Sequence, residues 1–238
     1  MIHAKDLGFS FGESILFKSV DFHLKSEEFV SILGKSGCGK STFLKLLSGV
    51  YPIQKGQIHM TEAVKSGIVF QDALLLPWLS VKENILLPFH FQSQEKFDSE
   101  WLHFLAQRLN LLDALNLFPH QLSGGMKMRA ALLRSLIEKP KILFCDEPLS
   151  ALDEWTREEA QDLFLELKSE FHLSCVFITH SISEAVYLSD RILIFSKQEK
   201  GFSREILYKK QSSLGFKRTD VAFVQACHDI SVQMKELK

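Results

Sequence analysis

The sequence predicts an α/β fold in which a mostly parallel sheet carries a phosphate-binding loop. The first observation is the pattern G-x-x-x-x-G-K-S at residues 34–41, between an apolar strand-like segment (29–33) and a helical segment that reaches Leu47. This strand–loop–helix context is what makes the pattern a phosphate-binding signature. The second observation is that two more apolar segments, 141–145 and 175–179, end directly in polar residues. Buried parallel strands end in this way at a ligand-binding edge.

Composition limits the possible functions. The chain has 238 residues, enough for one large α/β domain or two small ones. Its formal net charge of -1 gives no overall electrostatic signal for a nucleic-acid partner. The four cysteines include no CxxC pair, which favours reduced thiols over disulfides or a zinc site. We find no signal-peptide pattern and no run of the ~20 apolar residues of a membrane helix, so we expect any membrane role to depend on a partner.

The chain begins with short β segments, expected within residues 2–30, because residues 20–24 alternate apolar and polar side chains. The segment Phe9-Ser10-Phe11-Gly12 lies in this region. An exposed aromatic side chain there could stack on a purine base. On these residues alone, packing in the core is the favoured alternative.

The phosphate-binding loop follows. Its glycines let backbone N–H groups point toward an anion, with a helix N-terminus behind them. Lys40 is expected to reach the β- and γ-phosphates, the Ser41 hydroxyl to bind Mg²⁺, and Thr42 to add a phosphate contact. The flanking strand and helix disfavour a glycine-rich turn without a ligand. The predicted nucleotide-binding residues of this loop are Gly34, Lys35, Ser36, Gly37, Cys38, Gly39, Lys40, Ser41 and Thr42.

Cys38 in this loop has two interpretations. It lies near a helix N-terminus, where the pKa of a thiol can fall and the thiol can become reactive. A small residue that simply fits the loop is the favoured interpretation.

The next strands are expected at residues 56–60 and 66–70. The second ends at Gln71, whose side chain should point into the ligand crevice of a parallel sheet. A dense apolar run between Leu74 and Leu79 follows, and from residue 80 to 117 the pattern is helical. Ser80 and Glu83 have capping-box spacing. This region is predicted to be a helical insertion.

A second anion-binding helix start is predicted at Leu122-Ser123-Gly124-Gly125-Met126, directly before a helical run at 127–138. A hydroxyl group, bare backbone N–H groups and a helix dipole favour an anion there. The contacting residues are expected to be Ser123, Gly124 and Gly125. The chain therefore has two separate helix starts of the phosphate-binding type.

Two acidic residues and a histidine directly follow two later predicted strands. Asp146 and Glu147 follow the strand at 141–145, where Asp146 can hold Mg²⁺ and Glu147 can polarise a water. Two solvated turn acids are the disfavoured alternative. His180 follows the strand at 175–179, and a γ-phosphate contact is favoured over a structural role.

The remaining segments are expected to be regular up to the C-terminal region. A charged helix is predicted at 154–169, a helix at 183–188 and a strand at 191–195, whereas residues 197–217 look like an exposed strand pair or loop. The tail from Thr219 has helical spacing of its apolar residues, which are Phe223, Val224, Cys227, Ile230, Met234 and Leu237.

Taken together, these motifs resemble the ATPase subunit of ATP-binding cassette (ABC) transporters over nearly the whole chain. The matching stretches are GKSGCGKST at 34–42, Gln71, LSGGM at 122–126, ILFCDEP at 142–148, SALD at 150–153 and His180. Each motif alone is weak or moderate evidence, whereas their common order and spacing are specific. The resemblance implies a P-loop NTPase of ABC type with a mixed, mostly parallel core sheet, an N-terminal antiparallel β subdomain and a helical insertion.

The resemblance also implies a domain organisation and a catalytic site. One ABC ATPase domain would span residues 1–238, with its core at 1–71 and 138–198, a helical subdomain at 72–137 and a short tail at 199–238. The implied ligands are ATP and Mg²⁺. Catalytic roles would fall to Glu147, His180 and Gln71, and the metal-binding residues would be Ser41, Gln71 and Asp146.

In the family, two such domains enclose two ATP molecules head to tail. A second ABC ATPase subunit, in a homodimer, is therefore an implied partner, and Ser123 and Gly125 would contact the nucleotide that it holds. Asp153 would communicate across the dimer. Phe11 lies where the family places its adenine-stacking aromatic residue, which shifts the earlier balance toward stacking.

The resemblance further implies a membrane partner. An importer permease would dock near Gln71 and the run from Leu74 to Leu79, although these residues could also only pack the insertion. The segment VFQDALLLPWLSVKENI is most similar to the nitrate, sulfonate and taurine branch of importers. The chain would then act peripherally, at the cytoplasmic face of the inner membrane, and indirectly with a periplasmic or lipid-anchored solute-binding protein.

Other ABC ATPases remain as alternatives. One is an exporter or lipoprotein-release ATPase, which differs only in its partner. Another is a soluble ATPase that acts on nucleic acid or ribosomes. Proteins of that kind carry long coiled-coil insertions or tandem cassettes, and this chain shows neither.

The chain departs from the family pattern at two positions. Met128 replaces the usual Gln and, being near the start of its helix, is expected to alter contacts with the partner's nucleotide slightly. Cys145 replaces the usual aliphatic residue before Asp146, and a buried Cys is expected to be tolerated as a small hydrophobic residue.

Overall fold

The structure of the chain is a computed structural model, and it describes residues 1–238 except 62–63, 92–96, 208–217 and 237–238. The strands are β1 (Ile2–Phe11), β2 (Ser14–Leu24), β3 (Phe29–Leu33), β4 (Lys55–Met60), β5 (Ser66–Val69), β6 (Ile142–Asp146), β7 (Ser174–Thr179), β8 (Arg191–Ser196) and β9 (Gly201–Leu207). The α-helices are α1 (Lys40–Leu47), α2 (Val81–Phe91), α3 (Ser99–Arg108), α4 (Gly124–Leu136), α5 (Glu154–Phe171), α6 (Ile182–Leu188) and α7 (Val221–Glu236). Short 3-10 helices lie at η1 (Leu112–Ala114) and η2 (Pro119–Gln121).

The central sheet confirms the predicted α/β fold. Its strand order is β5-β6-β7-β3-β8-β9, in which the first five strands are parallel and β9 pairs antiparallel with β8 at the edge. The register places Leu33 opposite Thr179 and Asp146 opposite Ile178. The carboxyl ends of β3, β6 and β7 therefore meet at one edge, where parallel sheets bind ligands.

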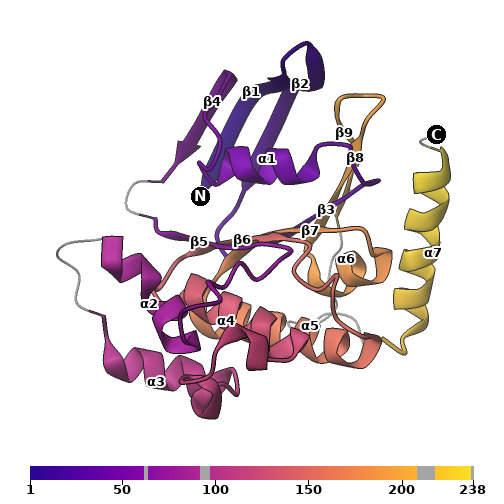
Figure 1. The fold of residues 1–238 in the computed structure, drawn as a ribbon. Coiled ribbons are helices and arrows are strands. Elements are labelled where there is room, and N and C mark those ends of the chain that lie inside the picture. Colours follow the sequence, from indigo (N-terminus) through magenta and orange to yellow (C-terminus); the bar gives the residue numbers. More distant parts are fainter. Residues whose placement is uncertain (62–63, 92–96, 208–217, 237–238) are drawn as a thin grey trace.

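A second, three-stranded antiparallel sheet, of order β2-β1-β4, covers α1 (Figure 1). Helix α1 lies between the two sheets and buries Phe43, Leu44 and Leu47 in the cluster that the sheets share. The burial of such side chains contributes about 1.5–3 kcal/mol each relative to exposure. The helix that follows the phosphate-binding loop is thereby fixed from both sides.

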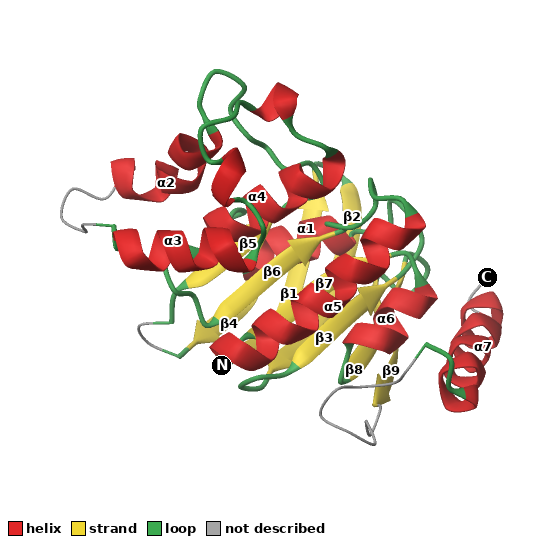
Figure 2. Cartoon of the chain, turned by 90° about the horizontal axis from the view of Figure 1, so that it is seen from below, coloured by secondary structure: helices red, strands yellow, loops and turns green. Residues whose placement is uncertain are grey.

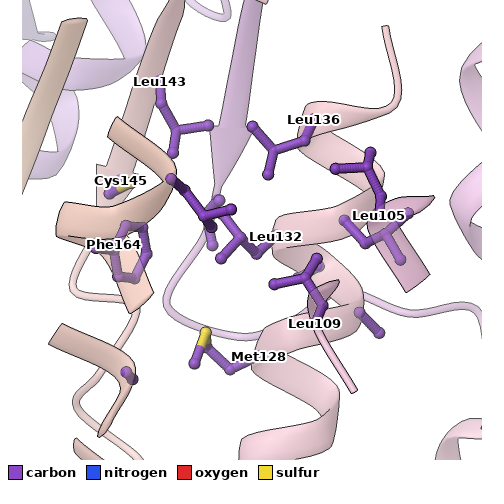
Figure 3. Packing of buried hydrophobic residues seen from close by; sticks show 14 of the residues in the cluster. Leu105, Leu109, Met128, Leu132, Leu136, Leu143, Cys145 and Phe164 are labelled. Atoms are coloured by element: carbon purple, nitrogen blue, oxygen red, sulfur yellow. The ribbon is translucent and has the colours of Figure 1, made fainter. Parts of the chain in front are cut away.

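The opposite face of the central sheet is covered by α4 and α5, with α2 and α3 beside them (Figures 1 and 2). Leu105 from α3, Leu132 from α4, Leu143 from β6 and Phe164 from α5 belong to one buried cluster (Figure 3). The helical insertion therefore shares its core with the sheet. The division into a core and a helical subdomain stays a prediction.

Met128 lies in this same cluster, and only 6% of its surface is exposed (Figure 3). The expectation that it alters contacts with a partner's nucleotide is wrong. Met128 is in the second turn of α4 and points into the chain's own core. An unbranched thioether is well suited to fill such a gap.

Local signals of the helical insertion are confirmed. The Ser80 N–H donates to Glu83 Oε2 at 2.7 Å and the Glu83 N–H donates to Ser80 Oγ at 3.2 Å, which forms the predicted capping box at the start of α2. Within the residues described, no helix is long and apolar enough to cross a membrane.

The C-terminal region supplies one edge strand and one helix. Strand β9 occupies part of the predicted polar segment, and residues 208–217 of that segment lie outside the described residues. Helix α7 buries Ala226 and Ile230 against α6 and β8. This helix confirms the helical spacing predicted for the tail, and Val224, 60% exposed, lies outside its buried face. Leu237 lies outside the described residues.

The shared cluster predicts a large stability difference between buried and exposed positions. Leu132→Ala should lower the free energy of unfolding by about 2–5 kcal/mol, because it removes a fully buried side chain and leaves a cavity. Val224→Ala should change it by less than about 0.5 kcal/mol. Urea denaturation without nucleotide measures both, and equal losses would contradict the assignment of the core.

Candidate functional site

The loop between β3 and α1 folds as a phosphate cradle. Gly39, at the N-cap of α1, has a φ of 112°, and a Cβ on Gly34 would lie 2.6 Å from the Phe195 carbonyl oxygen. Glycine is therefore required at both positions. The buried Lys40 ammonium donates to the Gly34 carbonyl at 2.8 Å and the Lys35 carbonyl at 3.1 Å, which holds its charge inside the loop.

Ser41 and Asp146 form the candidate metal site. The Ser41 hydroxyl donates to Asp146 Oδ1 at 2.8 Å, which joins the first turn of α1 to the end of β6. Burial raises the pKa of Asp146, and the hydrogen bond from Ser41 opposes that rise. A hydroxyl and a carboxylate oxygen side by side are the hard ligands that Mg²⁺ prefers, so these residues fit the ion that the sequence implies.

Glu147 lies between two nitrogen-bearing side chains. Its Oε1 is 3.8 Å from Lys40 Nζ and its Oε2 is 3.0 Å from His180 Nδ1. Its N–H donates to the Ile178 carbonyl at 3.1 Å, and its φ is 47°, in the left-handed region that non-glycine residues rarely adopt. Such a backbone costs of order 1–3 kcal/mol and is typical of functional sites. The geometry therefore aims this carboxylate at the cradle.

Lys40, Ser41 and Glu147 line one open cavity of about 400 Å³. Asp146 and His180 do not line it, and each bonds to a residue that does, Ser41 and Glu147 respectively. Among the predicted residues, Thr42, Gln71 and Glu147 line it together with the loop. The sequence reasoning missed Leu16 of β2, which also lines the cavity and would be met by a Cβ on Gly39 at 2.9 Å. Leu16 lies between Ile15 and Phe17 in an apolar segment, and nothing in that local pattern distinguishes it.

Phe11 is 53% exposed at the end of β1, as a base-stacking side chain needs to be. Its ring contacts those of Phe9 and Tyr51, at centroid distances of 5.0 and 6.3 Å. It is not among the residues that line the cavity, and its contact with adenine stays a prediction.

The second predicted anion site lies apart from this cavity. Ser123 caps α4 and accepts from the Met126 N–H at 3.3 Å, and a Cβ on Gly125 would lie 3.0 Å from Thr156 Cγ2. Asp153 caps α5 through the Thr156 N–H at 3.0 Å. The starts of α4 and α5 thus pack together, and none of the residues Ser123, Gly124, Gly125 and Asp153 lines the phosphate cavity.

Cys38 is a packed residue of the loop. Only 3% of its surface is exposed, and burial raises the pKa of its thiol. The favoured interpretation, a small residue that fits the loop, agrees with this environment. Cys145 is likewise fully buried, as expected, and burial raises its pKa strongly.

Comparison with known proteins gives a consistent result. The family model described as ABC transporter matches residues 17–150. The aliphatic sulfonates import ATP-binding protein SsuB 1 of Pseudomonas syringae pv. syringae is 36% identical, covering 79% of this chain and 78% of that protein. The protein of the same name, SsuB, from Zymomonas mobilis is 39% identical, covering 83% of this chain and 82% of that protein.

A solved structure agrees in fold and size. The dimeric post-hydrolysis state of the ATP-binding cassette MJ0796, bound to ADP and Pi, superposes with a TM-score of 0.77 at 30% identity. The match covers 88% of this chain and 99% of that one.

The buried state of the loop thiol gives a chemical test. When the native chain is treated with a maleimide at about pH 8, Cys227 should react first, because it is only half-buried. Cys38, Cys145 and Cys175 should stay unmodified until the chain is unfolded in urea, since burial shields them and raises their pKa, that of Cys175 to about 12. Mass spectrometry of peptides identifies the modified thiols. Modification of native Cys38 as fast as Cys227 would contradict the packed loop.

Proposed function

Because the chain belongs to the ABC transporter family, we propose that it is the ATP-hydrolysing subunit of an importer for sulfonates or similar small organic anions. The chain is an ABC-type ATPase and binds ATP. The observation that carries the proposal is the set of contacts around Glu147, which joins the phosphate cradle to two later strand ends in a chain similar to sulfonate import proteins.

Residues that line the cavity, together with Asp146 and His180 beside them, would each have a separate role in hydrolysis. Lys40 and the N–H groups of the loop bind the phosphates. Ser41 and Asp146 would hold Mg²⁺, which supplies positive charge to the phosphate oxygens. Glu147 accepts a proton from the attacking water, and His180 holds that carboxylate in place and lies where it can contact the γ-phosphate.

Gln71 would link the phosphate cavity to the helical insertion. It lines the phosphate cavity and also a smaller cavity with Met128 and Leu152. It can therefore sense Mg²⁺ or the attacking water on one side and the helical insertion on the other.

A homodimer completes the site in this proposal. Ser123, Gly124 and Gly125 offer a capped helix start that lies outside their own chain's phosphate cavity, so a second copy's nucleotide is their natural ligand. Asp153 lies beside them and would face the same partner. Trp155, 76% exposed at the same end of α5, adds apolar surface for such a contact.

A membrane permease would dock on the loop after Gln71. The side chain of Asn84 accepts from the Leu76 N–H at 2.6 Å and donates to the Leu76 carbonyl at 3.1 Å. The Arg134 guanidinium donates to the carbonyls of Ala73 and Leu74, both at 2.8 Å. The loop is thus held in shape while Trp78 stays 70% exposed. A rigid loop that presents a large apolar side chain is well suited to bind a helix of another protein.

This partner would place the chain peripherally on the membrane, at its cytoplasmic face. A periplasmic or lipid-anchored solute-binding protein would then act with it only through the permease. Export, lipoprotein release or action on ribosomes would use the same ATPase chemistry. The names of the similar proteins, which are import ATP-binding proteins for aliphatic sulfonates, favour import over these alternatives.

The assignment of Glu147 predicts a separation of binding from turnover. Glu147→Gln should lower ATP turnover by roughly 10²–10⁴, because a positioned proton acceptor is lost. Its affinity for ATP should stay near that of the unchanged chain, and ATP-bound dimers should accumulate. Phosphate release, nucleotide titration and light scattering measure the three quantities. Unchanged turnover would disprove the role of Glu147.

If a permease docks on the loop after Gln71, a change at Trp78 should weaken partner binding without lowering ATP hydrolysis. Trp78→Ala should leave the ATPase activity of the isolated chain unchanged. Recovery of a permease from solubilised membranes should fall roughly ten-fold or more, since a central interface Trp contributes about 2 kcal/mol or more. Val221→Ala, at an 85% exposed position on α7, is the matched control. Equal recovery with both variants would argue against docking at this loop.

A further inference from the structure

Arg157 and Glu184, two charged residues outside the phosphate cavity, lie between the loop that contains Asp153 and the segment around His180. The loop at residues 149–153 joins β6 to α5, and Arg157 lies in the first turn of α5. Glu184 lies in the first turn of α6, which begins shortly after β7 and His180. Helices α5 and α6 run side by side on one face of the sheet (Figures 1 and 2).

Arg157 holds the 149–153 loop. Its Nη2 donates to the Leu152 carbonyl at 2.7 Å and its Nε to the Leu149 carbonyl at 3.4 Å. The same Nε is 3.6 Å from Glu184 Oε1. One planar guanidinium therefore binds both ends of the loop and a carboxylate on the neighbouring helix, an arrangement that a lysine ammonium cannot reproduce.

Glu184 holds the backbone on both sides of His180. Its Oε2 accepts a hydrogen bond from the Thr179 hydroxyl, and that hydroxyl accepts from the Ser181 N–H at 3.0 Å. The side chain of Glu184 is only 7% exposed. Burial raises its pKa, and the Thr179 hydrogen bond and the charge of Arg157 oppose that rise. A buried carboxylate of this kind is costly for stability, so its presence needs a reason other than packing.

We propose that Arg157 and Glu184 are a positioning pair that couples the 149–153 loop to His180. When a second copy closes against Asp153, the loop shifts, and Arg157 transmits this shift to Glu184. Glu184 then fixes the position of segment 179–181. That position determines the contact between His180 and Glu147. Neither Arg157 nor Glu184 lines the phosphate cavity. This inference rests on the proposed dimeric ATPase and adds the path by which closure of the dimer reaches the catalytic contact.

Hydrogen–deuterium exchange tests the coupling in the full chain. In the Glu147→Gln background, added ATP and Mg²⁺ should slow exchange in both segments, 149–153 and 179–181. With Arg157→Lys added, segment 149–153 should still be protected, whereas segment 179–181 should lose its protection. Arg108→Lys is the control, because Arg108 also pairs with α5, through Glu166 and Glu170, and its side chain is 31% exposed against 34% for Arg157.

Turnover gives the second readout. Without the Glu147 change, Arg157→Lys and Glu184→Gln should each lower kcat about 10- to 100-fold, the scale of a slight misplacement of catalytic groups, with KM for ATP within about two-fold. The double variant should be no worse than the poorer single one, because both break one link. The Arg108→Lys variant should keep normal kcat.

The possible failures are distinguishable. Full protection of segment 179–181 in the Arg157→Lys variant, or normal kcat, would overturn the coupling and leave the proposed ATPase intact. Additive losses in the double variant would also overturn it. If the unchanged chain and the Arg108→Lys variant failed to hydrolyse ATP, both the coupling and the proposed function would be wrong.

Discussion

The site depends on the parallel register of β3, β6 and β7. Because Leu33 lies opposite Thr179 and Asp146 lies opposite Ile178, residues from three distant parts of the chain meet at one sheet edge. The Ser41–Asp146 hydrogen bond of 2.8 Å then joins the phosphate cradle to the strand that carries the acids. A slip of one residue in any of these strands would turn the site residues to the wrong face.

The two candidate anion sites differ in how they are built. The cradle is fixed by α1, which is buried between two sheets, and its Lys40 is already bonded to the loop. The starts of α4 and α5 are packed on each other and do not line that cavity. A single chain therefore presents a cradle and a separate capped helix start, which the proposed homodimer would bring together.

Sequence reasoning predicted what local patterns and strand ends determine. The G-x-x-x-x-G-K-S pattern predicts the cradle, and polar residues that directly follow apolar strands predict the positions of Gln71, Asp146 and Glu147. Residues whose role comes from the tertiary fold were not predictable. The burial of Met128 depends on how α4 packs in the fold, which its place near the helix start does not show, and the place of Leu16 in the cavity needs β2 to lie beside the loop. The Arg157–Glu184 contact joins separate helices and leaves no mark in the sequence.

The central claim is that the phosphate loop of one chain is half of a catalytic site. The most direct test measures steady-state ATP hydrolysis over a wide range of protein concentration, with sedimentation to determine the fraction of monomer. Where the chain is monomeric, activity per molecule should rise in proportion to concentration, because only dimers turn over. An activity per molecule that stays constant throughout the monomeric range would contradict the account.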